Sequence, residues 1–279
     1  MINPMPSYQF FQVDAFTDRA FAGNPAAVFI LDRPAEERWM RNVAREMNLS
    51  ETAFLHRAES SDSTLFNLRW FTPAVEVDLC GHATLAAAHV LWQTNTLPSN
   101  VDAKFQSRSG RLGAKLLDGW IELDFPATQP AALAANEATS LASDLSQALG
   151  TPVKQALRTR FDLLVVLDSE AAVRQLTPDF GKLRRLNGRG IIVTARADAP
   201  PYDFISRFFA PSAGVDEDPV TGSAHCALTL YWADKLGKPR MLAYQASARG
   251  GVVRVELRGQ RVALAGQAVT VARGELLPD

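Results

Sequence analysis

Side chains that could move a proton stand at three places in this sequence. Glu51 lies between an expected helix end and an expected strand, where working side chains are common. His82 opens an expected helix, and Asp218 lies in an acidic stretch just before another. Carboxylates and imidazoles are the usual groups of general acid–base catalysis. Each also has a structural interpretation, as a loop acid, a helix-start residue or a cap, and the residues alone leave both interpretations open.

Two glycines stand in the first turns of these helices, Gly81 in one and Gly222 in the other. Free N–H groups and the positive end of the dipole make such a turn an anion site. Two such turns could hold a carboxylate. The alternative is ordinary capping, with Thr221 and Asp218 satisfying the N–H groups, and the spacing does not decide between the two.

Several other chemistries lack their motifs. No Gly-rich nucleotide loop, Walker loop, nucleophile elbow or H-E-x-x-H helix occurs. Cys80 and Cys226 each lie in an apolar run, which favours buried reduced thiols over a disulfide. A metal site made of His82, His225 and the acids lacks ligand spacing, so no metal and no other cofactor is expected.

Two apolar helices must position these groups. Segments 81–92 and 222–232 are apolar almost all round, so each should be buried on every side, wrapped by its own sheet. The other expected helices cover 35–47, 138–150 and 178–186. Short strands rich in aromatic and β-branched residues are expected elsewhere, at 8–16, 26–31, 52–56, 65–71, 104–107, 111–117, 120–125, 161–168, 190–195, 204–209, 244–248, 252–257, 261–265 and 267–272.

An internal repeat precedes the two apolar helices. The pattern R-aromatic-F-x-P-x3-V-D begins at Arg69 and again at Arg207, 138 residues later. The offset between the helix glycines is 141, so the second copy has three extra residues, which this alignment places around 217–219. This alignment makes Asp216 the copy of Asp78 and leaves Asp218 outside the residues that the two repeats share. The repeat predicts two similar lobes that face each other across a cleft.

The composition is that of a globular protein. The 279 residues are 47% apolar and carry a formal net charge of −1, which gives no electrostatic footprint for nucleic acid or an anionic membrane. The densest basic group, between 182 and 189 and including Arg189, is interpreted as a solvated loop or helix end. Residues 1–6 lack a signal-peptide pattern and no apolar run reaches about 18 residues, so a cytoplasmic protein is expected.

Five motifs in order along the chain resemble the phenazine-biosynthesis PhzF-like protein family. They are Val13-Asp14-Ala15-Phe16 with Phe21-Ala22-Gly23-Asn24-Pro25-Ala26, Asn48-Leu49-Ser50-Glu51-Thr52, Phe71-Thr72-Pro73, Cys80-Gly81-His82-Ala83-Thr84, and Glu217-Asp218-Pro219-Val220-Thr221-Gly222-Ser223-Ala224. The resemblance implies an α+β, diaminopimelate-epimerase-like fold of two pseudo-symmetric lobes, each a mostly antiparallel sheet or barrel round a central helix. It also implies a homodimer and a cofactor-independent isomerase.

The resemblance also implies where the lobes and the site lie. Residues 1–126 would form the first lobe, joined by a C-terminal strand from 266–279, and 127–265 the second, with the active site in the cleft. Glu51 would be the general acid/base, and His82, Asp218 and Ser223 would line the site. The N–H groups of Gly81 and Gly222 would hold the substrate carboxylate.

Related epimerases use two cysteines at the helix starts. Here Cys80 occupies the first such place, and Thr221 occupies the second. This difference disfavours a two-thiol mechanism. We therefore expect an isomerase that shuttles a proton between carbons of a small carboxylate-bearing metabolite. A Cys80-assisted racemase, epimerase or dehydratase and a non-catalytic small-molecule-binding protein are the alternatives.

Overall fold

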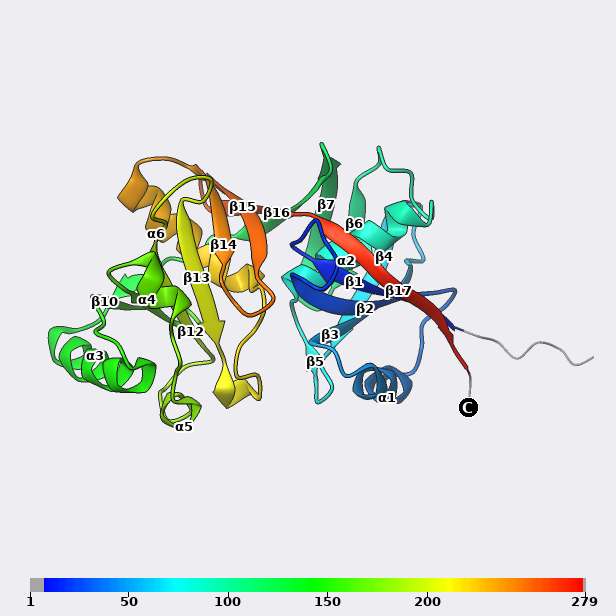
Figure 1. The fold of residues 1–279 in the computed structure, drawn as a ribbon. Coiled ribbons are helices and arrows are strands. Elements are labelled where there is room, and N and C mark those ends of the chain that lie inside the picture. Colours follow the sequence, from blue (N-terminus) through cyan, green and yellow to red (C-terminus); the bar gives the residue numbers. More distant parts are fainter. Residues whose placement is uncertain (1–7, 278–279) are drawn as a thin grey trace, which may run out of the picture. The chain divides into compact units, whose positions relative to one another are not determined.

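The computed structural model describes residues 8–277 and divides into two units (Figure 1). Unit 1 comprises 8–124 and 265–277, and unit 2 comprises 125–264. Both combine strands with helices, which confirms the expected α+β class. The prediction about a signal peptide concerns residues 1–6, which lie outside the described residues, as do 278 and 279 of the predicted C-terminal strand. No described helix is long and apolar enough to cross a membrane.

Unit 1 is built on one run of paired strands. Their order is β17-β1-β2-β3-β4-β6-β7-β8, with the short β5 also on β4. Pairs β2–β3 and β4–β6 are parallel, and the other pairs are antiparallel. The strands are β1 (Tyr8–Ala15), β2 (Asn24–Leu31), β3 (Glu51–Arg57), β4 (Leu65–Phe71), β5 (Glu76–Val77), β6 (Ala103–Ser107), β7 (Gly110–Leu117), β8 (Trp120–Pro126) and β17 (Ala268–Leu276).

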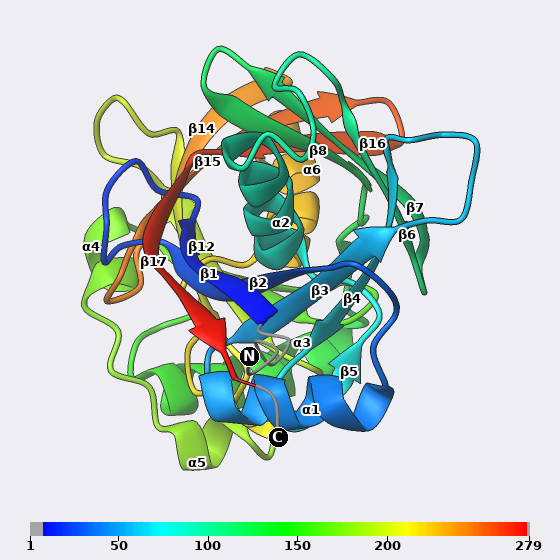
Figure 2. The ribbon, with the colours of Figure 1, turned by 90° about the vertical axis from the view of Figure 1, so that its right-hand side faces the viewer.

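Two helices pack on unit 1 in different ways. Helix α2 (Gly81–Gln93) is buried on nearly every side by the strands around it, as its apolar sequence predicts (Figure 2). Helix α1 (Glu37–Met47) is amphipathic and buries Met40, Val43 and Ala44 against an aromatic cluster on β2, β3 and β4. The sheet therefore has a core on both faces, and α2 is the element that it encloses.

Unit 2 repeats this arrangement. Pairs β10–β11, β12–β13 and β14–β15 are antiparallel and pairs β11–β12 and β13–β14 are parallel, in the same succession as β1 to β7. The strands are β9 (Ala131–Ala132), β10 (Gln155–Arg158), β11 (Leu163–Val166), β12 (Ile191–Arg196), β13 (Phe204–Phe209), β14 (Arg240–Gln245), β15 (Gly251–Arg258) and β16 (Arg261–Gly266). The helices are α3 (Ala135–Leu149), α4 (Glu170–Arg174), α5 (Phe180–Leu183), the 3₁₀ turn η1 (Pro211–Ala213) and the buried α6 (Gly222–Leu236).

The structure corrects the alignment of the two repeats. Arg69 holds Glu76 through Nε and Nη2, and Arg207 holds Glu217 in the same way, so the offset is already 141 at the glutamates. The backbone shows the same offset. The Asp218 N–H donates to the Phe208 carbonyl, and the corresponding residues of unit 1, Val77 and Trp70, are partners in the β4–β5 pair. The three extra residues therefore lengthen the turn around η1. Asp216 is not the structural copy of Asp78, and Asp218 belongs to the shared scaffold, at the place of Val77.

A few elements differ from their predicted places. Strand β14 begins four residues before the expected start at 244, and α5 is shorter than the expected helix at 178–186. Strand β10 and helix α4 were not predicted. These are short elements whose sequence pattern is weak, whereas the long apolar helices begin at the predicted glycines.

Candidate active site

Glu51 and His82 form the centre of the unit 1 site. Glu51 is the first residue of β3, and His82 is the second residue of α2. His82 Nε2 lies 3.1 Å from Glu51 Oε2, and the two side chains are only 6% and 18% exposed. A carboxylate and an imidazole that are both shielded from water can exchange a proton with a ligand and with each other.

The other edge of the His82 ring faces Asn24 and Cys80. Asn24 Nδ2 lies 3.2 Å from His82 Nδ1, and Cys80 Sγ lies 3.5 Å from the same nitrogen. With the amide NH₂ facing Nδ1, the neutral ring carries its proton on Nε2, toward Glu51. The charged ring also carries one there, so His82 presents an N–H to Glu51 in both states.

Gly23 fixes the position of Asn24. Its φ is +64°, and a Cβ at this position would lie 2.1 Å from the carbonyl oxygen of Ala15. Only glycine fits this close approach at the start of β2. The Ala22-Gly23-Asn24 motif therefore acts on His82 through the Asn24 amide.

Burial and charge shift the pKa values in this group. Burial, with the Glu51 charge nearby, raises the pKa of the Cys80 thiol to about 11, so Cys80 is a neutral thiol at neutral pH. Burial disfavours a charged His82 ring, but the negative charges that Cys80 and Glu51 can carry outweigh it and raise the His82 pKa well above its usual value. While the thiol keeps its proton, Glu51 is the charge that acts on His82.

Neither buried helix is capped by the side chain at its N-cap position. Cys80 and Thr221 precede α2 and α6, and neither side chain accepts a hydrogen bond from the first turn. Thr221 Oγ1 donates instead to Asp218 Oδ2. The part of the capping alternative that involves Thr221 is therefore wrong, and anion binding at the two helix starts stays a prediction.

A buried glutamine holds the loop before α6. Gln245 Oε1 accepts from Thr221 N–H at 2.9 Å, and Gln245 Nε2 donates to the Asp218 carbonyl at 2.7 Å and to Thr221 Oγ1 at 3.3 Å. These bonds hold the backbone of Asp218 beside the start of α6. Gln245 was not predicted, because its partners are 24 and 27 residues away along the chain.

Arg189 is a second residue that was not predicted to belong to the site. Its Nε and Nη2 bind both oxygens of the buried Asp162 at 2.9 and 2.6 Å, and Nη2 also donates to Ser223 Oγ at 2.9 Å. The guanidinium lies over Phe161 and Phe208. Arg189 lies in a loop with its side chain 43% exposed, as predicted for a solvated basic group, and its bonds to Asp162 and Ser223 also make it a positioned cation beside the second residue of α6.

The predicted residues fall into two groups. Unit 1 brings together Glu51, Cys80, Gly81 and His82. Unit 2 places Asp218, Thr221, Gly222 and Ser223 within the loop and first turn of α6. That both groups serve one substrate stays a prediction.

His225, a candidate metal ligand in the sequence, does not lie in either group of site residues. Its ring is fully buried, and Nδ1 donates to the Thr221 carbonyl at 2.8 Å. Among the described residues, the three side chains that could share a metal ion are instead Glu51, Cys80 and His82.

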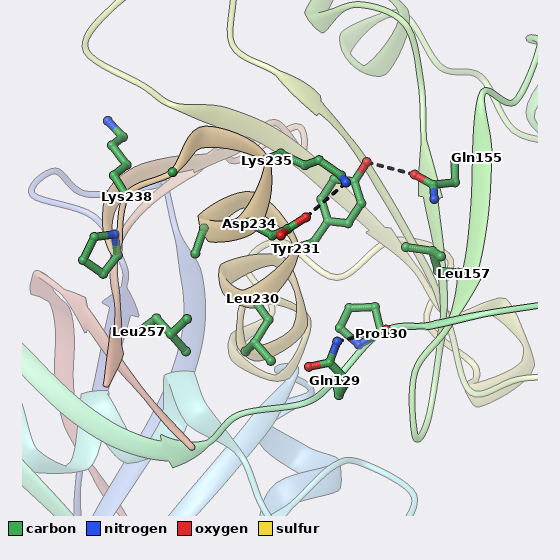
Figure 3. Close-up of a pocket in the computed structure, with 13 residues that line it drawn as sticks. Gln129, Pro130, Gln155, Leu157, Leu230, Tyr231, Asp234, Lys235, Lys238 and Leu257 are labelled. Atoms are coloured by element: carbon green, nitrogen blue, oxygen red, sulfur yellow. Dashed lines mark hydrogen bonds and ion pairs between the residues drawn. The ribbon is translucent and has the colours of Figure 1, made fainter. Parts of the chain in front are cut away.

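A cavity of about 640 Å³ lies elsewhere in unit 2 (Figure 3). It adjoins the last turns of α6, where Tyr231 donates to Gln155 and Lys235 pairs with Asp234. None of the predicted site residues lines it. We therefore place the candidate active site at the helix starts and not in this cavity.

The comparisons with known proteins cover nearly the whole chain. The family model described as phenazine biosynthesis-like protein (PhzC-PhzF) matches residues 13–274. A relative from Halalkalibacterium halodurans, named an uncharacterized isomerase, is 51% identical over 95% of this chain and 97% of its own. The crystal structure of a PhzF-family phenazine biosynthesis protein from Enterococcus faecalis superposes with a TM-score of 0.90 at 41% identity, covering 98% of this chain and all of that one.

A more distant structure shows the same fold. The hydroxyproline epimerase of Agrobacterium vitis has a TM-score of 0.61 at 13% identity and covers 98% of this chain and 93% of its own. The fold predicted from the five motifs is thus confirmed. The chain belongs to the phenazine biosynthesis-like protein family.

Proposed function

We propose that this protein is an isomerase that moves a proton between carbons of a small carboxylate-bearing metabolite. The observation that carries the proposal is the shielded Glu51–His82 pair, 3.1 Å apart, at the start of the uncapped helix α2. This arrangement provides a base and a positive electrostatic environment in one place.

The proposed reaction begins with Glu51. Its carboxylate removes a proton from a substrate carbon, and the negative charge that develops on the substrate is stabilised by the first-turn N–H groups at Gly81. His82, whose Nε2 lies 3.1 Å from Glu51 Oε2, orients the carboxylate. Glu51 then returns the proton at another carbon, which moves the double bond. The scheme uses no cofactor.

The start of α6 would hold an anionic group of the substrate. The first turn of α6, which begins at Gly222, contributes main-chain N–H groups, and Ser223 contributes a hydroxyl that Arg189 already orients. Asp218 and Thr221 would shape this end through their hydrogen bond. The isomerase name of the H. halodurans relative supports this class of reaction.

A Cys80-assisted racemase, epimerase or dehydratase is the second candidate, and one observation favours it. Cys80 Sγ lies 3.5 Å from His82 Nδ1, within reach of a base. The raised thiol pKa of about 11 opposes it, since the thiol must lose its proton to attack or to act as a base. Glu51, whose Oε2 lies 3.1 Å from His82 Nε2, remains the preferred base.

The homodimer and the cytoplasmic location belong to the same proposal. Both rest on the resemblance and the sequence. Light scattering of the purified chain at several concentrations measures the oligomeric state. Fractionation of the source cell measures the location.

Incorporation of deuterium from heavy water tests the function. Cyclic and linear carboxylates are incubated with the wild type and with Cys80→Ser, and mass spectrometry locates the label. We expect label at carbon next to an activated position, at similar rates for both proteins. Loss of exchange in folded Cys80→Ser would select the second candidate. Binding without exchange by any ligand found in a thermal-shift screen would select a non-catalytic protein.

A further inference from the structure

Three different metal-binding atoms meet in unit 1. Glu51, Cys80 and His82 each offer one ligand atom, and these atoms lie within 4.8 Å of one another. Carboxylate oxygen, thiolate sulfur and imidazole nitrogen are the donors that protein-bound Zn²⁺ uses. The three side chains are buried or half-buried, so few waters compete with them.

The distance between two of these atoms suits a tetrahedral ion. Cys80 Sγ and His82 Nδ1 are 3.5 Å apart. An ion about 2.3 Å from sulfur and about 2.0–2.1 Å from nitrogen would then subtend an angle of about 107°, close to the tetrahedral value. Glu51 now faces Nε2, and would turn from that nitrogen to become the third ligand.

We propose that Glu51, Cys80 and His82 form a binding site for a thiophilic divalent cation, with Zn²⁺ as the reference ion. The Cys80 thiol gives its proton to solvent when the ion binds, and the Asn24 amide moves away from His82 Nδ1. Three protein ligands leave a fourth position for water. Sulfur ligation selects Zn²⁺ or Co²⁺ over Mg²⁺, which prefers oxygen ligands.

Occupancy of this site would switch off the isomerase. This consequence rests on the proposed function, because the ion takes the Glu51 carboxylate and the His82 ring away from proton transfer. The cation is therefore an inhibitor and not a cofactor. The binding itself does not depend on the reaction being an isomerisation.

Titration of the purified chain with Co²⁺ tests the binding directly. Cobalt bound to a thiolate gives a near-ultraviolet sulfur-to-metal band, and tetrahedral cobalt gives strong visible bands. We expect both bands at one equivalent, their displacement by Zn²⁺, and no change with Mg²⁺. Cys80→Ser should lose the sulfur band and bind at least about 100-fold more weakly, whereas Cys226→Ser, at the other buried cysteine, should keep the bands.

Each outcome decides the proposal. No sulfur band in the folded wild type, or a band that persists in Cys80→Ser or vanishes in folded Cys226→Ser, overturns it. His82→Asn, whose small polar side chain removes the imidazole ligand, gives a second measurement: unchanged affinity for Co²⁺ contradicts the site. Cobalt bands in a protein that never exchanges deuterium would leave the metal site standing and reject the isomerase, so the two failures are distinguishable.

Discussion

His225 and Thr84 occupy equivalent places in the first turns of α6 and α2, and both bind the carbonyl of the residue that precedes the helix. His225 Nδ1 donates to Thr221, and Thr84 Oγ1 donates to Cys80. The same backbone group is thus satisfied by an imidazole in one unit and by a hydroxyl in the other. This pairing makes His225 a structural residue, and its burial lowers its pKa to about 4.

The lowered pKa predicts a loss of stability in mild acid. The usual His pKa is 6.5, so between pH 6.5 and about 4 the unfolded chain binds a proton that the folded chain excludes. The stability is complete above pH 6.5 and falls as pH falls. Between pH 7.5 and 5, the wild type should lose about 2 kcal/mol more than His225→Asn, whose amide can still donate to Thr221. Urea unfolding at both pH values measures this difference, and parallel losses in the two proteins would contradict it.

The site was predictable only in part at the residue scale. Glu51 and His82 could be named because one lies at a strand start and the other at a helix start, which are local features. Asn24 and Arg189 could not, since each acts on a residue far away in the sequence, 58 positions for Asn24 and His82 and 34 for Arg189 and Ser223. Only the fold brings such pairs together.

At the scale of elements, the start of α6 depends on strand β14. Gln245 ends this strand and is fully buried, and its side chain holds the Thr221 N–H and the Asp218 carbonyl. A buried N–H that loses its partner costs about 1–3 kcal/mol. Gln245→Leu should therefore lower the free energy of unfolding by at least that amount and loosen the loop at 218–221.

Denaturant unfolding checks this prediction. Gln147→Leu is the matched control, because Gln147 is exposed on α3 and its replacement should change stability by less than about 0.5 kcal/mol. Equal stabilities for Gln245→Leu and Gln147→Leu would show that the glutamine does not hold the loop.

The elements themselves were predictable to different degrees. The two apolar helices were predicted because a helix without a polar face has to be enclosed. The repeat was also predicted, but its alignment was wrong, since the match of Asp216 with Asp78 arose from a lengthened turn and not from shared structure. The ion pairs Arg69–Glu76 and Arg207–Glu217 give the true correspondence.

At the scale of the whole molecule, the C-terminal segment of the chain belongs to unit 1, together with the N-terminal residues. Strand β17 pairs with all of β1, from Tyr8 with Leu276 to Ala15 with Ala268. In unit 2 the corresponding partner of β10 is β9, which spans only Ala131–Ala132. The C-terminal segment is therefore an integral part of unit 1.

Removal of residues 267–279 should destabilise unit 1 selectively. Without β17, the outward edge of β1 loses its ladder of hydrogen bonds, whereas β11, β12 and β13 keep theirs. Hydrogen–deuterium exchange of backbone amides checks the result, with unit 2 as the internal control. Faster exchange in β1 but not in β12 is expected, and unchanged protection of β1 would contradict the role of β17.

The central claim is that the Glu51 carboxylate carries the proton. It is tested by the rate of solvent deuterium incorporation into a carboxylate ligand by Glu51→Gln, together with the dissociation constant of that ligand. For Glu51→Gln we predict an exchange rate about 10²–10⁴-fold below that of the wild type and a ligand affinity within a few fold of it. The control Glu46→Gln, at an exposed glutamate on α1, should exchange at the wild-type rate. An exchange rate in folded Glu51→Gln equal to that of the wild type would contradict the account.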